Sequence, residues 1–205
     1  MVLPSRSGGR DAIVGSVSDH DSLVALWQYL AKSAATVWGR VGRTPVLRIA
    51  GRGWTEISIA GALAVSPGRK HARGRRIRQF FRLYEHDIDG PTCAPFLREL
   101  LRAVRGPPML LWDGLAVHRS PTARAVLAGR RRVEVIRLQS YAPELNPVEP
   151  MWGHAKGVGL RGFVPADALD LELETDFVLN DISREKRLLR GFFRATALRV
   201  PGVTT

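Results

Sequence analysis

The segment Met109-Leu-Leu-Trp-Asp113 is the most informative stretch for the fold. Four consecutive apolar residues followed by an acid are typical of a short strand that is buried on both faces of a sheet. Gly106-Pro-Pro108 comes directly before this strand and ends the helical pattern that precedes it. In open α/β sheets, ligands and metal ions collect at the carboxyl ends of such strands. Asp113 is therefore the first candidate functional residue.

The flanking sequence predicts an α/β domain with a mixed sheet flanked by helices. Strands are rich in β-branched and small apolar residues, whereas helices repeat apolar residues every three to four positions. By these patterns we expect strands at residues 46–50, 56–65, 77–84, 109–112 and 133–138, the first two joined as a hairpin. We expect helices to begin near Pro91, Ser120, Pro147, Pro165 and Ile182.

The composition fits a single folded domain, alone or with a small appendage. The 205 residues are 45% hydrophobic and 24% charged, so the chain can bury a core and does not resemble a disordered protein. No apolar run approaches the roughly 20 residues of a membrane span, and residues 1–10 have no signal-peptide pattern. Cys93 is the only cysteine, which excludes a disulfide framework and a thiolate zinc cluster. We expect a cytoplasmic protein with no membrane partner.

Basic residues clearly outnumber acidic ones. The chain has 31 Lys and Arg against 19 Asp and Glu, and its net charge is +12. Such an excess favours a polyanionic partner, of which nucleic acid is the most obvious. The densest basic cluster comprises Arg69, Lys70, Arg73, Arg75 and Arg76. This cluster is a candidate site of phosphate contact, and the alternative is the solvated surface of a hairpin.

Glu149 is the second candidate acid, 36 residues after Asp113 and in the first turn of an expected helix. A strand-end aspartate and a helix-start glutamate can converge on one divalent ion, because Mg²⁺ prefers carboxylate oxygens and retains some waters. Two such ions, about 4 Å apart, can activate water or a 3′-hydroxyl in phosphodiester cleavage. The alternative is that Asp113 is merely exposed and Glu149 stabilises the positive end of the helix dipole.

Two stretches resemble the DDE endonuclease core of bacterial insertion-sequence transposases in the mariner superfamily. They are Leu110-Leu-Trp-Asp-Gly-Leu-Ala-Val-His-Arg-Ser120 and Ser140-Tyr-Ala-Pro-Glu-Leu-Asn-Pro-Val-Glu-Pro-Met-Trp152. Residues 36–45 and 53–61 also resemble early strands of that family, so the resemblance extends from about Trp38 to the C-terminus.

The resemblance implies an RNase H-like fold, Mg²⁺ or Mn²⁺ at a two-ion site, and DNA cleavage followed by strand transfer. By position, Asp113 corresponds to the second catalytic acid and Glu149 to the third, and both would be metal ligands. The implied partners are transposon-end DNA and target DNA, together with a second copy of the chain or a full-length transposase.

Neighbouring residues gain roles from the same resemblance. His118 is close enough in sequence to orient Asp113 or to meet a phosphate, although by itself it would be interpreted as a structural histidine. Asn146, which precedes a proline, shapes the turn that aims Glu149. Lys156 follows Glu149 by seven residues, shares its helical face and is a candidate for contact with the DNA backbone.

The first catalytic acid of the family has no counterpart in the expected place. The family supplies it from the first strand, shortly before the motif that contains Trp38. Here that region reads Leu23-Val-Ala-Leu-Trp-Gln-Tyr-Leu30, and no acid occurs between Ser22 and Glu56. Asp21 is the nearest candidate for a substitute ligand. An incomplete set of ligands would hold metal weakly and leave close carboxylates repelling each other.

The N-terminal helix-turn-helix region of the family is also not recognisable. We therefore expect residues 1–36 to be a replaced or truncated segment, residues 37–180 the RNase H-like endonuclease domain, and residues 181–205 a C-terminal helical tail. The expected function is that of a transposase catalytic domain impaired by the missing acid. One alternative is a catalytically dead remnant that only binds DNA or a full-length transposase. The other is an RNase H-like nuclease with a different substrate.

Overall fold

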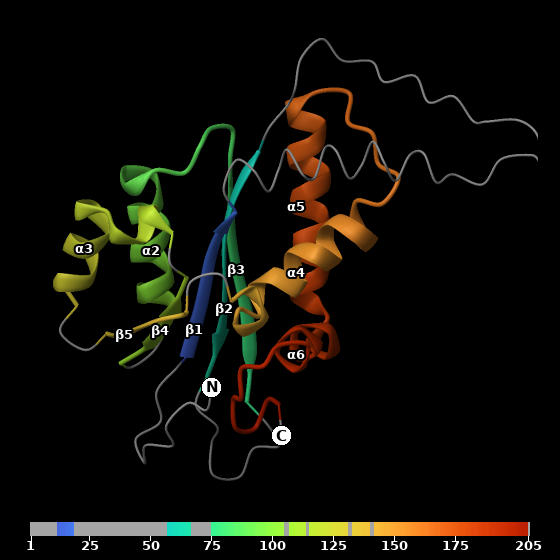
Figure 1. The fold of residues 1–205 in the computed structure, drawn as a ribbon. Helices are drawn as coiled ribbons and strands as arrows, with labels where there is room; N and C mark the ends of the chain where they lie inside the picture. The colour runs from blue at the N-terminus through green and yellow to red at the C-terminus, as the bar shows by residue number, and fades with distance from the viewer. Residues whose placement is uncertain are drawn as a thin grey trace, which may run out of the picture.

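The fold is described from a computed structural model of the chain. The structure describes residues 12–18, 57–66, 75–104, 107–113, 115–130, 133–139 and 142–204. One central sheet has helices on both of its faces (Figure 1). The strand expected at residues 46–50 lies outside the described residues, and so does the hairpin turn that follows it.

Within the described residues, the sheet has five strands in the order β3-β2-β1-β4-β5. β2 is antiparallel to both of its neighbours, whereas β1 is parallel to β4 and β4 is parallel to β5. This confirms the mixed sheet and the α/β class expected from the sequence. The bounds of the strands are β1 Ala12–Ser18, β2 Ser58–Val65, β3 Ile77–Tyr84, β4 Met109–Trp112 and β5 Glu134–Arg137.

The register of the strands aligns their ends along two opposite edges of the sheet. Ala12 of β1 pairs with Val65 of β2 and with Met109 of β4. Val65 in turn pairs with Ile77, the first residue of β3. The starts of β1, β3 and β4 therefore lie together at one edge. Their carboxyl ends lie at the other edge, which Asp113 follows directly.

The two faces of the sheet carry different side chains of β2, because successive residues of a strand point to opposite sides. Ala60, Ala62 and Ala64 pack in one apolar cluster with helix α2 (Gly90–Ala103) and with Ala123 of helix α3 (Pro121–Ala128). The larger residues on the other face pack with three helices on the right of Figure 1. These helices are α4 Val148–His154, α5 Ala168–Arg184 and α6 Lys186–Arg194.

Polar caps fix where three of these helices begin. The Asp89 carboxylate accepts a hydrogen bond from the Thr92 N–H at the start of α2. The Ser120 hydroxyl accepts one from the Ala123 N–H at the start of α3, as the sequence predicts. Asp167 does the same for the Asp170 N–H of α5. Each cap satisfies a backbone donor that has no partner within its own helix.

The helix that carries Glu149 differs from its expected form. α4 ends at His154, and residues 155–159 continue it as a π-helical segment. Gly159 ends this segment directly against Val178 of α5, where a β-carbon would clash with the valine methyl groups. The wider π turn and the glycine therefore allow the backbone to approach α5 closely.

The described elements extend beyond the central domain boundaries expected from the sequence. β1 falls within residues 1–36 and pairs with both β2 and β4. α6 falls within residues 181–205, and its Leu189, Phe192 and Phe193 are buried in the main core. The division into three parts stays a prediction. No helix in the described ranges has the length and apolar character needed to cross a membrane.

Candidate active site

Asp113 directly follows β4, and its side chain makes one hydrogen bond to the backbone and one close contact with His118. The strand before it is buried along its whole length. Its carboxylate oxygen Oδ1 accepts a hydrogen bond from the backbone N–H of Leu115 at 3.2 Å and contacts His118 Nδ1 at 2.7 Å. The side chain is only 22% exposed. Asp113 is therefore a carboxylate at the carboxyl end of β4 whose rotation is restricted by these contacts.

His118 is buried, and its ring lies against the Asp113 carboxylate. It lies in the short 3-10 helix Ala116–Arg119, and its side chain is 5% exposed. The ring packs edge-on against Trp112, with the centroids 4.3 Å apart. Nδ1 also lies 3.5 Å from the backbone carbonyl oxygen of Asp113, and a hydrogen bond there requires the tautomer, or the charged form, that carries hydrogen on Nδ1. Because the ring has little access to solvent, it suits positioning of the acid better than contact with a phosphate.

Asn146 lies just before α4, and its side chain contacts both the start of the helix and Glu149. The buried Asn146 side chain accepts a hydrogen bond from the Val148 N–H through Oδ1 at 3.1 Å. Through Nδ2 it donates to Glu149 Oε1 at 3.4 Å. One amide thus satisfies a donor at the start of the helix and also aims the carboxylate. Glu149 itself is exposed at the surface.

A close contact with β2 sets the position of α4 on the sheet. A β-carbon on Gly61 would lie 2.6 Å from the ring of Trp152, so the indole rests directly on the glycine backbone. Gly61 pairs with Ser16 of β1, and the preceding residue Gly15 pairs with Trp112. α4 therefore crosses the sheet at the level where β4 ends and Asp113 begins.

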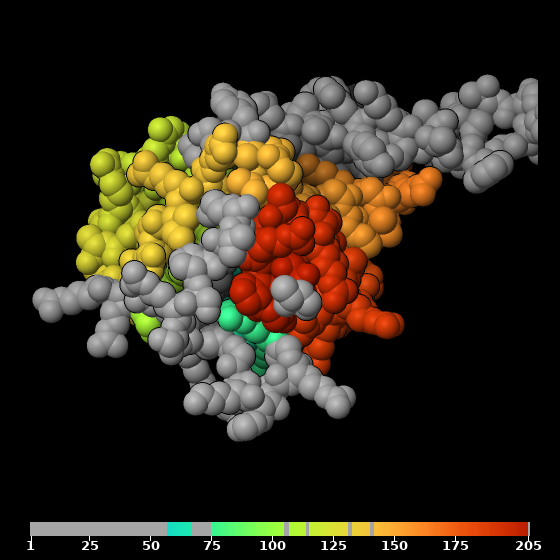
Figure 2. Space-filling model, turned by 60° about the horizontal axis from the view of Figure 1, so that its bottom comes forward, coloured from blue at the N-terminus to red at the C-terminus, as the bar shows by residue number. Residues whose placement is uncertain are grey.

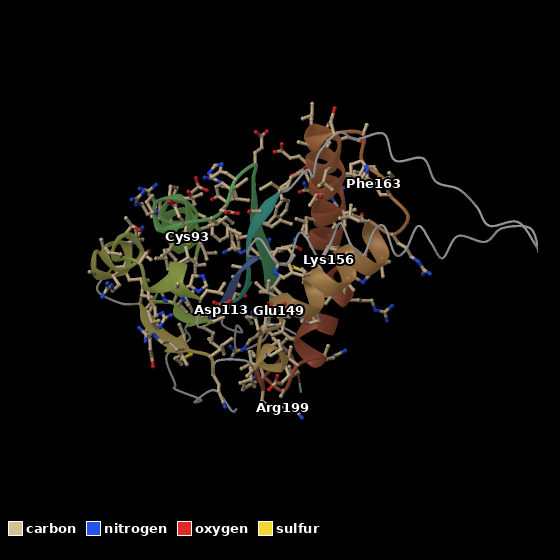
Figure 3. All side chains as sticks on the ribbon, turned by 45° about the horizontal axis from the view of Figure 1, so that its top comes forward. Cys93, Asp113, Glu149, Lys156, Phe163 and Arg199 are labelled. Carbon is tan, nitrogen blue, oxygen red and sulfur yellow. The ribbon has the colours of Figure 1, made fainter. Side chains whose placement is uncertain are left out.

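The fold brings the two predicted acids to the same end of the sheet. Asp113 directly follows β4, and Glu149 lies one helical turn before the Trp152 that rests on β2. Figure 3 labels both residues at this end of the sheet. Residues far apart in sequence thus come to the same end of the sheet through the pairing of β1 with both β2 and β4. Their roles as metal ligands stay a prediction.

Lys156 lies in the π-helical segment, near Glu149. Burial lowers the pKa of the Lys156 ammonium, and the negative charge of Glu149 opposes this shift. The two side chains are therefore within electrostatic reach of each other. The half-buried position leaves contact with a DNA backbone as a prediction for this lysine.

The third carboxylate expected of a two-ion site is not found among the described residues. β1 reads AIVGSVS and contains neither Asp nor Glu, although it lies between β2 and β4. Within the described ranges, no group of three His, Cys, Asp or Glu residues is placed to hold a metal ion. Asp21 lies outside these ranges. The described residues therefore do not complete the metal site that the sequence predicts.

The basic residues proposed for phosphate contact divide into two sets. Arg69, Lys70 and Arg73 lie outside the described residues. Arg75 and Arg76 directly precede β3, at the edge of the sheet opposite Asp113. They line a cleft that also includes Lys186 and Arg190 of α6, which the sequence analysis did not connect with them. The dense positive charge of residues 184–194 was the feature of the sequence that could have indicated a second basic segment.

Comparison with known proteins identifies the family of the chain. Residues 30–167 match the family model of the DDE superfamily endonucleases. No curated protein sequence matches the chain. The chain resembles a solved Mos1 strand transfer complex with a TM-score of 0.52 and 13% identity, over 90% of this chain and 51% of that one. A Mos1 transposase paired-end complex with the left transposon end gives a TM-score of 0.52 and 12% identity, over 90% and 50%.

A third solved structure, the catalytic domain of Mos1 mariner transposase, gives a TM-score of 0.46 and 15% identity, over 66% of this chain and 67% of that one. The chain spans about half the length of the transposases in the two complexes. At these identities the likeness concerns the fold, which is RNase H-like as expected. On this family match over residues 30–167, the chain belongs to the DDE superfamily endonucleases.

Proposed function

We propose that the chain is a transposase catalytic domain for DNA cleavage and strand transfer, impaired because its first catalytic carboxylate is missing. The observation that carries this proposal is the composition of β1. This strand pairs with β4 up to Trp112, directly before Asp113, yet its sequence AIVGSVS contains no acid. The family match supports action on DNA, and the net charge of +12 favours the same polyanion.

The proposed roles follow from the positions of the side chains. Asp113 and Glu149 are two ligands of a Mg²⁺ or Mn²⁺ site, of the kind that DDE transposases use. His118 positions Asp113, and Asn146 positions Glu149. Asp21 stays a candidate third ligand. The proposed partners are transposon-end and target DNA, with a second copy of the chain or a full-length transposase, and the proposed location is the cytoplasm.

An alternative function is a catalytically dead remnant that binds DNA or a full-length transposase. The absence of an acid from β1 favours it, because a weak two-carboxylate site need not support any cleavage. This alternative predicts salt-sensitive DNA binding that is unaffected by changes at Asp113 or Glu149.

A gain-of-function substitution tests the proposal. Ser16 follows Gly15, the partner of Trp112, and therefore occupies the register position beside Asp113. We expect the unmodified chain to nick a supercoiled plasmid slowly or not at all with Mg²⁺ or Mn²⁺. Ser16→Asp should raise nicking at least tenfold, and adding Asp113→Ala or Glu149→Ala should abolish that gain. Ser18→Asp, two residues further along β1, is the matched control.

Each outcome has a defined meaning. Strong nicking by the unmodified chain that requires Asp113 and Glu149 would show that catalysis is intact, and Asp21→Ala would then test the substitute ligand. Equal nicking by Ser16→Asp and Ser18→Asp would contradict the assignment of position 16. DNA binding without nicking in every variant would favour the remnant.

A further inference from the structure

A basic cleft lies at the edge of the sheet away from the acids. It has a volume of about 480 Å³ and lies between the start of β3 and the junction of α5 with α6. Figure 2 views the molecule toward this edge, where the start of β3 lies beside the C-terminal part of the chain. The basic residues that line it are Arg75, Arg76, Arg78, Lys186 and Arg190.

Among the described residues, no acid neutralises the positive charge of the cleft. No Asp or Glu lines it, and none of its five basic side chains forms an ion pair with a described carboxylate. Arg82, further along β3, differs because its guanidinium binds both oxygens of Glu99. Solvent-exposed positive charges without partners attract an anion from solution.

Backbone contacts hold the walls of the cleft in place. The Arg190 guanidinium donates to the carbonyl of Arg75 at 2.7 Å and to that of Gly202 at 3.4 Å. Arg78 donates to the carbonyl of Ala103 at 2.8 Å, at the end of α2. Arg76 and Lys186 make no such bond to a described residue, and both are exposed. The cleft thus combines arginines that are fixed by backbone contacts with two exposed cationic residues.

The register places this cleft far from the candidate active site along the strands. Ile77 of β3 aligns through Val65 and Ala12 with Met109, the first residue of β4. Asp113 follows the last residue of β4. The two sites therefore lie at opposite edges, with the length of a strand between them. A ligand in the cleft would leave the acids accessible.

We propose that this cleft binds the phosphate backbone of duplex DNA, as a holding surface separate from the acids. The proposal rests on the proposed function, since both take DNA as the ligand. The separation between the cleft and the acids suits a polymeric ligand. One duplex carries phosphates along its whole length and can therefore contact both edges of one small domain. Contacts to phosphate fix the position of a protein on DNA without selecting a sequence.

Fluorescence anisotropy with a labelled duplex, in the absence of divalent metal, tests the proposal on the full chain. The double variant Arg76→Gln/Lys186→Gln should weaken binding on the order of tenfold or more near 0.1 M salt, and should reduce the slope of log affinity against log salt by about 2. The control Arg98→Gln/Arg102→Gln removes two exposed arginines from α2 and the same net charge. It should change affinity less than twofold.

The alternatives give different results. Equal losses in both double variants would show that only net charge matters, and no loss in the cleft variant would show that DNA binds elsewhere. Either result overturns the cleft proposal but leaves the proposed function intact. Failure of the unmodified chain to bind DNA would overturn both. Displacement of DNA by inorganic phosphate beyond the effect of equal ionic strength would identify a small-anion site instead and overturn the proposal.

A site-specific crosslink provides a second measurement that does not depend on net charge. Burial raises the pKa of the native thiol at Cys93 to about 11, so this buried group reacts little near neutral pH. Lys186→Cys, labelled with a photocrosslinker, should capture DNA efficiently, whereas Arg98→Cys should not. Equal capture at the two positions would contradict a specific surface at the cleft.

Discussion

The two edges of the sheet place opposite charges in different structural settings. At the acid edge, Asp113 is mostly buried and is oriented by the ring of His118 at 2.7 Å. At the basic edge, Arg76 and Lys186 are exposed and have no carboxylate partner among the described residues. Polar groups that are oriented and partly removed from water suit chemistry, because their positions are fixed in advance. Exposed cations suit retention of a polyanion, because their attraction needs little orientation.

This difference predicts that the edges respond differently to substitution. Changes at His118 and Asp113 should affect folding stability as well as chemistry, since these two side chains of the acid edge are largely buried. Changes at the basic edge should affect DNA binding and leave stability nearly constant.

The largest effect is expected for His118→Ala. This change removes a buried ring and the hydrogen bond to Asp113, so it should lower the free energy of unfolding by about 2–4 kcal/mol. Urea unfolding followed by tryptophan fluorescence measures it. The exposed His86→Ala is the control and should stay within about 0.5 kcal/mol of the unmodified chain. Equal effects at the two positions would mean that the acid edge is not packed as described.

A pH-dependent effect of similar size is expected at Cys93, which is near enough to Asp113 to sense its charge. Burial, and secondarily that negative charge, raise the pKa of the thiol from 9.0 to about 11. Because the folded state favours the protonated thiol, its contribution to stability is complete below pH 9 and is lost as the pH rises toward 11. The loss should reach about 2–3 kcal/mol.

Urea unfolding between pH 8 and pH 11 measures this loss. Cys93→Ala provides the reference, because every other titrating group is retained in it. The unmodified chain should lose more stability than this variant across the interval. Parallel pH profiles would show that the thiol is not protected in the folded state.

Gly61→Ala tests how α4 is held over the sheet. The new methyl group would lie 2.6 Å from the Trp152 ring, so the variant should lose about 1–3 kcal/mol of stability and displace the helix that carries Glu149. Trp152→Leu should recover part of this loss in a double-mutant cycle, because it makes room for the methyl group. Additive losses would show that the indole and the glycine are not in contact.

A smaller effect is expected for Asn146→Ala. The substitution removes the acceptor for the Val148 N–H at the start of α4, which should cost about 1 kcal/mol. Asn146→Asp keeps that acceptor, so it should keep more of the stability than Asn146→Ala. The negative charge that it places beside Glu149 acts in the opposite direction. Chemical denaturation compares the two. A larger loss in the aspartate variant would mean that repulsion from Glu149 outweighs the cap.

The smallest effect on stability is expected at the basic edge. Arg76→Gln/Lys186→Gln should change the free energy of unfolding by less than about 0.5 kcal/mol, because both side chains are exposed and neither forms an ion pair with a described residue. Thermal and urea unfolding check this, and the same preparation serves the DNA-binding measurement. A clear loss of stability would contradict the separation of the two edges.

Local patterns in the sequence were sufficient for most of the elements. β3 and β4 have the bounds that alternation and the apolar run predict, and α3 begins at the predicted Ser120 cap. These features depend on neighbouring residues, whose geometry is set by the periods of strands and helices. The π-helical segment 155–159 was missed, because it depends on close packing against Val178 of α5.

The sequence by itself identified Asp113 and Glu149 as candidate acids. It also showed that the first catalytic acid of the family has no counterpart in the expected place upstream of them. Only the tertiary structure decided which residues meet, because β1 pairs with strands that follow it by some 40 to 100 positions. That pairing put Asp113 beside the helix of Glu149 and put Arg75 at the opposite edge. Strand register is a property of long-range pairing, and short sequence patterns do not determine it.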